Sequence, residues 1–346
     1  MWERVFTALS SKLLYVLGEV IYMNNKEREE FWNVLLTLKN EADSEKLLDK
    51  IKYPDKLYRY RSVNIKTLNA LADNKLYFST PNYYDDPFDT FIRIDIKKLQ
   101  NYARCFENQN IPAPFLPLYK YIPKENLLKE NLDIILNNAI SFVKESRNKI
   151  RKHIWSLCFT EKYSNENLWL KYANAHKGFV LEYDVNSLNN IKFNTELPAR
   201  LAKCGDVKMS LYPIYYAEDE NVYDATAYAI FIDLCNYLEK TNRTPLIQEL
   251  VSKGIFMWEM EKIILIKKCI HHYDEEWRLV LNSQYRIESS AKPYIFCKPS
   301  KIILGLKMSD DDKQAVLRAS KEADINYKEQ MIIDSNDEFT SEKLLN

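Results

Sequence analysis

Glycine is scarce in this chain of 346 residues and occurs only at Gly18, Gly178, Gly205, Gly254 and Gly305. Dinucleotide-binding fingerprints and P-loops need clustered glycines, because several backbone N–H groups must approach the phosphates closely. The motifs GxSxG and HExxH are also missing from the sequence. These absences argue against a standard NAD dehydrogenase, a P-loop NTPase, an α/β-hydrolase and a zincin.

The cysteines are few and scattered: Cys105, Cys158, Cys204, Cys235, Cys269 and Cys297. No CxxC pair occurs, which argues against a zinc ribbon or a thioredoxin motif and favours reduced thiols in the cytoplasm. The apolar run LLYVLGEVIYM at 13–23 is shorter than the ~18 to 20 residues of a membrane span and contains Glu19. We expect a buried helix there and no membrane partner.

The charges balance, with 49 Lys and Arg against 49 Asp and Glu. No overall field therefore attracts the chain to nucleic acid or to acidic membranes, and a polyanionic partner would need a local patch. Hydrophobic residues make up 46% of the chain, which is enough to bury a large core.

Helical and strand patterns alternate along the chain. Apolar residues recur at three- and four-residue intervals before residue 52, and short aromatic or β-branched runs follow at 57–61, 76–80, 153–160, 179–185 and 276–281. This pattern predicts an α+β, or mixed α/β, fold with a central mixed sheet flanked by helices. We expect an N-terminal helical extension at 1–52, an α/β domain at 53–334 with a helical insertion at about 97–150, and a C-terminal tail at 335–346.

Five stretches in order have a familiar pattern, namely LYRYRS (57–62), LYFSTPNYYDDPFD (76–89), LWLKYANAHKGFVLEYD (168–184), DEEWRLVL (274–281) and KIILGLKMS (301–309). Together they resemble the bacterial family catalogued as domain of unknown function 2971, over roughly residues 55 to 310. The family name implies no activity, so the function has to be inferred from the residues themselves.

The acidic residues Asp274, Glu275 and Glu276 lie at the start of a predicted strand. On a strand, Asp274, Glu276 and Arg278 share one face, because alternate residues point the same way. Two neighbouring carboxylates repel each other, which raises the pKa of one of them unless a cation lies close. Arg278 could supply that cation. An ion-pair network at the end of the strand is the structural alternative.

The acid-x-acid pattern, the early LYR and the Phe78-Ser79-Thr80 stretch together resemble the Arg–Ser–Glu arrangement of mono-ADP-ribosyltransferases. The resemblance implies NAD as the substrate and a macromolecular acceptor, either protein or nucleic acid. It implies that Arg59 holds the NAD ribose or phosphate, Ser79 orders the nicotinamide pocket and Glu276 binds the ribose 2′-hydroxyl, while Asp274 orients the acceptor. By analogy, such an enzyme could be a toxin or a phage-defence effector.

Aromatic residues and a histidine surround these positions, and we count Tyr60, Thr80, Trp169, Tyr172 and His176 with the residues that could bind the nucleotide. Trp169 and Tyr172 lie on one face of a predicted helix, as core residues or as a stacking wall. In LYRYR the tyrosines share one strand face and Arg59 and Arg61 share the other, so either face could contact a nucleotide.

Two other functions stay open at this point. Asp86, Asp89 and Glu276 could hold Mg²⁺ in a nuclease, although Arg278 stands where such enzymes usually have a lysine. Alternatively, the chain could be a module without enzymatic activity that binds nucleotide or nucleic acid through LYRYR and the aromatic helix. For the transferase hypothesis we expect no bound metal.

Overall fold

The computed structural model describes residues 23–38, 44–91, 93–108, 151, 154–189, 208–218, 223–242, 258–282, 292–336 and 338–344, with a few isolated positions between them. The predicted helix at 13–23 lies outside these residues except for Met23, as does most of the predicted insertion at 97–150. Among the described residues, no helix is both long and apolar enough to cross a membrane.

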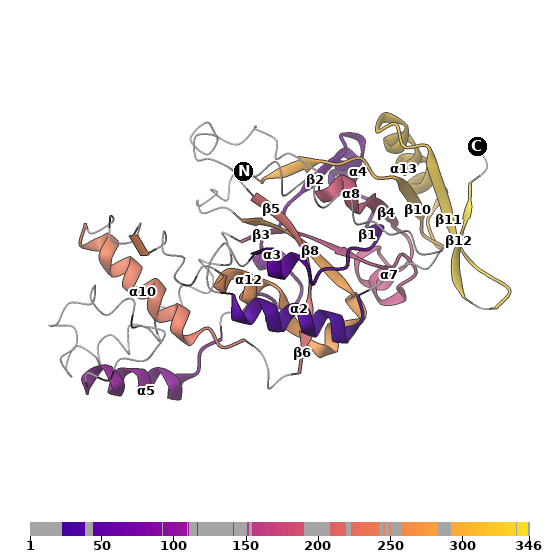
Figure 1. The fold of residues 1–346 in the computed structure, drawn as a ribbon. Coiled ribbons are helices and arrows are strands. Elements are labelled where there is room, and N and C mark those ends of the chain that lie inside the picture. The colour runs from indigo at the N-terminus through magenta and orange to yellow at the C-terminus, as the bar shows by residue number, and fades with distance from the viewer. Residues whose placement is uncertain are drawn as a thin grey trace.

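A mixed eight-stranded sheet forms the centre of the protein, in the order β12-β11-β10-β4-β1-β3-β8-β5 (Figure 1). Only β10 and β11 run parallel, and all other neighbours are antiparallel. The fold is therefore α+β, as the sequence predicts. The strands are β1 (Lys56–Arg61), β3 (Trp155–Thr160), β4 (Phe179–Asp184), β5 (Lys208–Pro213), β8 (Glu276–Asn282), β10 (Lys301–Leu304), β11 (Tyr327–Ile333) and β12 (Phe339–Lys343).

Two small sheets accompany the large one. Strand β2 (Lys75–Tyr77) pairs with β9 (Tyr294–Phe296), and β6 (Tyr215–Ala217) pairs with β7 (Ile266–Lys268). The apolar and aromatic run LYPIYYA at 211–217 is divided between β5 and β6. Pro213 has no N–H for a ladder, and the strand changes partner at Ile214.

Each face of the large sheet has its own apolar core. On one face, which we call the α7 face, Tyr60 and Val180 pack with Trp169 of helix α7 (Glu166–Tyr172). On the opposite face, Leu57 and Leu181 belong to the larger core. This division follows from strand geometry, because neighbouring residues such as Leu57 and Tyr58 point to opposite sides.

Helices and 3₁₀ turns surround the sheet: α2 (Asn25–Thr37), α3 (Ser44–Leu48), α4 (Ile65–Ala72), η2 (Pro81–Tyr83), α8 (Val185–Asn189), α12 (Glu259–Ile264), η7 (Cys269–Asp274) and α13 (Asp310–Glu322). Capping boxes begin two of them, with Asn24 and Glu27 at α2 and Asn64 and Thr67 at α4. Phe31 of α2 is fully buried in the larger core, so the described part of the N-terminal extension packs into the domain.

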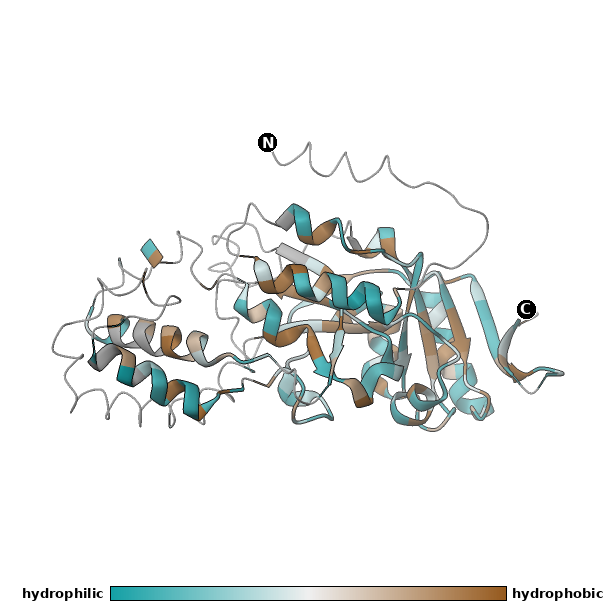
Figure 2. Ribbon diagram, turned by 60° about the horizontal axis from the view of Figure 1, so that its bottom comes forward, coloured by the Kyte–Doolittle hydropathy of each residue, from teal (hydrophilic) through white to brown (hydrophobic). Residues whose placement is uncertain are grey.

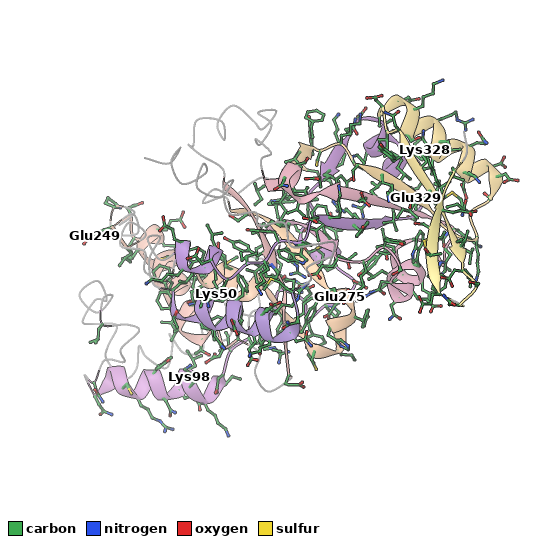
Figure 3. The ribbon with its side chains drawn as sticks, turned by 45° about the vertical axis from the view of Figure 1, so that its right-hand side comes forward. Lys50, Lys98, Glu249, Glu275, Lys328 and Glu329 are labelled. Carbon is green, nitrogen blue, oxygen red and sulfur yellow. The ribbon has the colours of Figure 1, made fainter. Side chains whose placement is uncertain are left out.

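Helices α5 (Ile96–Glu107) and α10 (Thr226–Lys240) lie side by side and form an arm that extends away from the sheet (Figures 1 and 2). A parallel bridge between Arg93 and Asp224 joins the two chain segments at the base of the arm. Lys98 of α5 binds Asp224 at 2.5 Å in the same region (Figure 3). Of the insertion predicted at 97–150, the structure thus describes mainly α5.

The residues predicted to be a C-terminal tail, 335–346, instead contribute the edge strand β12, which pairs with β11. Phe339 packs beside the core of the α7 face, and its ring stacks on that of His176 at 5.3 Å. This apolar contact explains why a polar segment is ordered at the edge of the sheet.

Candidate functional site

The sequence stretches around residues 81–90, 266–268 and 274–278 meet at the edge of the α7 face of the sheet. There they form a buried group of charges that we call the ionic cluster, made of Asp89, Lys267, Asp274, Glu276 and Arg278. Each of these side chains is at most 8% exposed. Three carboxylates face two cations, which is an unusual concentration of charge for a protein interior.

Arg278 lies at the centre of the ionic cluster and is fully buried. Its Nη1 and Nη2 donate to the two carboxylate oxygens of Asp89 at 2.9 and 2.6 Å, and its Nε donates to Glu276 Oε1 at 2.6 Å. The ring of Tyr84 lies against the guanidinium at 5.3 Å. Charge-assisted, two-pronged bonds of this kind fix both carboxylates in place.

Lys267 of β7 joins the remaining members of the cluster. Its Nζ donates to Asp274 Oδ2 at 2.7 Å and to Glu276 Oε2 at 2.9 Å, and lies 3.8 Å from Asp89 Oδ2. Asp274 and Glu276 are therefore neighbours that share one ammonium group. The other carboxylate oxygen of Asp274, Oδ1, is buried and has no hydrogen-bond partner among the described residues.

The backbone around Asp274 differs from the predicted strand. Asp274 ends the 3₁₀ turn η7, Glu275 has a left-handed conformation with φ of 42°, and β8 begins only at Glu276. Asp274 and Glu276 therefore meet because the chain turns between them. Of the three residues expected to share one strand face, Glu276 and Arg278 do so, and Asp274 lies outside the strand. A left-handed conformation is costly for a glutamate and is more common at functional sites than elsewhere.

The cluster shifts the two carboxyl pKa values in opposite directions. Burial raises the pKa of Asp274, and the neighbouring Lys267 ammonium offsets only part of that effect. Burial alone would also raise the pKa of Glu276, but Arg278 and Lys267 outweigh it and hold this pKa well below its usual range. Of the two, Asp274 is the stronger base and Glu276 is the group that stays ionised.

Partly exposed side chains border the cluster. Asp85 forms an ion pair with Lys171 and accepts a hydrogen bond from the hydroxyl of Tyr172 at 3.0 Å. Tyr172 is 40% exposed, and burial of its hydroxyl together with the nearby charge of Asp85 raises its pKa, with smaller effects from Lys267 and Asp274 of the cluster. This end of α7 therefore forms the rim of the site.

Arg59 does not reach the ionic cluster. The strand register places Tyr58, Thr160 and Glu276 in one row on the α7 face. Arg59 follows Tyr58, so its side chain points to the opposite face, where its guanidinium lies 5.8 Å from the ring of Phe159. The expected meeting of Arg59 and Glu276 across one pocket is therefore not seen, because the two side chains lie on opposite faces of the sheet.

The other residues predicted to bind a nucleotide have structural partners. Ser79 pairs through its backbone with Ser156 of β3, and Thr80 is buried ahead of η2. The Tyr60 hydroxyl donates to the carbonyl of Lys162 at 2.9 Å. These contacts hold the residues in the fold and leave none of them beside Glu276.

Trp169 and His176 belong to the core of the α7 face. Trp169 is fully buried, and its Nε1 donates to the carbonyl of Tyr163 at 2.7 Å. The His176 ring is stacked between Trp169 and Phe339, with a centroid distance of 5.4 Å to Trp169. Of the aromatic residues singled out on this helix, Tyr172 alone is at the rim of the site.

Of the three carboxylates considered for Mg²⁺, Asp89 and Glu276 meet in the ionic cluster, and Asp86 does not join them. Asp86 binds Nε2 of His271 at 3.1 Å, whereas Asp89 and Glu276 both bind Arg278. In the part of the chain that the structure describes, no three His, Cys, Asp or Glu side chains are placed to hold a metal ion. The nuclease hypothesis gains no support from this arrangement.

Sequence reasoning missed Lys267, which occupies the place beside the acidic pair where only Arg278 was expected. Lys267 lies on the three-residue strand β7, nine positions before Glu276 in the sequence. A lysine in a run of apolar residues gives no signal of its own. Its pairing with three carboxylates depends on the turn η7, which folds the chain back between β7 and β8.

Comparison with protein-family models, with curated proteins and with solved structures finds no match for this chain. The resemblances noted in the sequence therefore stay predictions.

Proposed function

We propose that the protein is an enzyme that cleaves the N-glycosidic bond of a nucleotide at the ionic cluster, with NAD as the first substrate to test. One observation carries the proposal. Asp274 and Glu276 share the ammonium group of Lys267, and their surroundings push their pKa values apart. Neighbouring carboxyl groups with separated pKa values are typical of acid–base and glycosyl-transfer sites.

Glu276 supplies the fixed negative charge. When the bond between ribose C1′ and the nicotinamide nitrogen breaks, its electron pair leaves with nicotinamide and positive charge develops on the ribose ring. A carboxylate held ionised by Arg278 and Lys267 stabilises that charge in the transition state more than in the bound substrate. A carboxylate has about four acceptor sites, so these two bonds leave capacity for the substrate.

Asp274 supplies the base. Its unpartnered Oδ1 can accept the proton of the attacking group, a hydroxyl or amine of a macromolecular acceptor or a water molecule. The lone pair of that group forms the new bond to C1′, and its proton moves to Oδ1. A raised pKa suits this role, because a more basic carboxylate takes a proton more readily.

The ring of Tyr172 gives the site an aromatic surface at its rim. It is exposed on one side and anchored on the other through its hydroxyl bond to Asp85. A nicotinamide or nucleobase could stack on such a ring, since stacking on an aromatic side chain contributes about 1–3 kcal/mol per base. This placement favours a nucleotide over a purely aliphatic substrate.

Nicotinamide release from NAD, measured by chromatography with and without a cell lysate as a source of acceptors, tests the proposal. We expect turnover by the wild type and a loss of at least 100-fold in Asp274→Asn, in line with the typical contribution of a general base. Glu276→Gln should also be inactive, and its folding has to be checked because it leaves Arg278 and Lys267 short of negative charge.

Glu275→Gln is the matched control. Glu275, labelled in Figure 3, lies between the two proposed catalytic residues, but its side chain is 30% exposed and binds Lys162 at 2.6 Å. This variant should retain wild-type turnover. Absence of any NAD cleavage by the folded wild type, with every acceptor source tried, would remove the proposal.

A further inference from the structure

Two guanidinium groups lie close together on the face of the sheet opposite the ionic cluster. Arg59 and Arg61 are two positions apart on β1, so both point to that face. Arg59 is 8% exposed, and its Nη1 is buried without a hydrogen-bond partner among the described residues. Arg61 donates from Nη1 to the carbonyl of Tyr60 at 3.2 Å.

Neither arginine forms an ion pair with a carboxylate of the described residues. Other buried cations in the same part of the chain do: Arg28 binds Glu161 at 2.6 Å, and Lys262 binds Glu259 at 2.8 Å. Burial lowers the pKa of Arg59 and of Arg61, and the charge of Arg59 lowers that of Arg61 further. The two positive charges thus repel each other in a place where solvent screens them poorly.

Strand β1 stops pairing with β3 beside these arginines. Strand β1 pairs with β4 along all its residues, but in the described structure it shares only the pair Tyr58 and Thr160 with β3. Further along β3, Ser156 pairs instead with Ser79, which arrives from β2. Between these two points the described residues show no pairing of β1 with β3, and Arg59 and Arg61 lie on this unpaired side of β1.

We propose that Arg59 and Arg61 bind a phosphate group, either free or on a nucleotide, beside the stretch where β1 does not pair with β3. A guanidinium presents two parallel N–H groups that match two oxygens of a phosphate, and two such forks on one strand face can grip one phosphate or two linked ones. The anion supplies the negative charge that the described residues do not. This site is separate from the ionic cluster and does not depend on the reaction proposed there.

Isothermal titration and thermal unfolding with inorganic phosphate, pyrophosphate and ADP test the site, at constant ionic strength set with chloride. For the wild type we expect binding and a rise in Tm with at least one of the three anions. Arg59→Met and Arg61→Met should weaken binding on the order of 10- to 100-fold, the equivalent of a lost hydrogen bond between charged groups. Equal affinity for pyrophosphate and ADP indicates that phosphate alone is recognised, and tighter ADP binding indicates a nucleotide.

The ligand-free variants give a second readout. Arg59→Met should unfold at a temperature no lower than the wild type, because the substitution removes a buried charge that has no counter-charge. Arg28→Met is the control, since it removes the ion-pair partner of the buried Glu161; it should lower Tm but keep the anion response. Asp274→Asn should also keep that response. A wild type that binds none of the anions, or an Arg59→Met variant with wild-type affinity, would overturn the proposal.

Discussion

Arg278 and Asp89 lie 189 positions apart in the sequence and form a two-pronged ion pair in the interior, with N–O distances of 2.9 and 2.6 Å. Asp89 comes from the loop after η2, and Arg278 comes from the third position of β8. Thr90, directly after Asp89, has a left-handed conformation and also accepts a bond from Arg278. The pair therefore fixes this loop against the sheet and closes the ionic cluster on one side.

Asp89→Asn should destabilise the protein by about 3–5 kcal/mol, because it leaves a fully buried guanidinium short of its counter-charge. Urea unfolding followed by fluorescence measures this loss. Asp85→Asn is the control, since Asp85 is 46% exposed and its ion pair with Lys171 is at the surface. That substitution should cost about 1 kcal/mol or less. Equal effects of the two substitutions would show that the buried pair does not stabilise the fold.

Glu261→Gln should stabilise the protein at neutral pH but not at acidic pH. Burial raises the pKa of Glu261 to about 7, from its usual value of 4.5. The folded protein thus holds this proton more tightly than the unfolded chain, and its unfolding free energy falls as the pH rises from 4.5 to about 7. The loss from this group is at most about 3 kcal/mol.

Urea unfolding at pH 5 and pH 8 checks this sign. The difference between Glu261→Gln and the wild type should grow from pH 5 to pH 8 in favour of the variant. Glu239→Gln, an exposed glutamate on α10, should show no such growth. A variant whose advantage shrinks as the pH rises would contradict the assignment.

Gly178→Ala should destabilise the protein by about 2 kcal/mol or more, as expected when a side chain has no room. A Cβ at this position would lie 2.1 Å from the carbonyl oxygen of Arg61 and 2.9 Å from Ala173 Cα, and both of these atoms belong to the backbone. The close approach lets the residues after α7 pass beside β1. Thermal unfolding measures the effect, and Lys177→Ala, at an exposed neighbouring position, should leave Tm nearly unchanged. A wild-type Tm for Gly178→Ala would show that the backbone can move apart at no cost.

Strands β1, β3, β4 and β8 and their two faces were predictable from the sequence, because alternation along a strand is a local property. LYRYR, for example, divides into tyrosines on one face and arginines on the other, as expected. The meeting of Glu276 with Arg278 was predictable for the same reason, since the two residues are two positions apart on one strand.

The rest of the site depends on relationships that a sequence pattern does not contain. Whether Arg59 and Glu276 lie on the same face of the sheet depends on the register between β1, β3 and β8. This register is fixed only when the sheet assembles. Lys267 and Asp274 meet through the 3₁₀ turn η7, and Asp274 meets Glu276 through the left-handed Glu275, whereas periodicity predicts a strand that already contains Asp274. Asp89 reaches Arg278 through a loop whose path no local signal fixes.

The pH dependence of nicotinamide release from NAD, compared between the wild type and Asp274→Asn, tests whether Asp274 acts as the base beside an ionised Glu276. We expect the wild-type kcat/KM to rise with pH through a pKa above the usual range of an aspartate, because Asp274 must lose its proton to act as a base, while Glu276 stays ionised throughout. In Asp274→Asn the rate should be at least 100-fold lower and should lack that rise. A wild type that releases no nicotinamide, or an Asp274→Asn variant with the same profile as the wild type, would contradict the account.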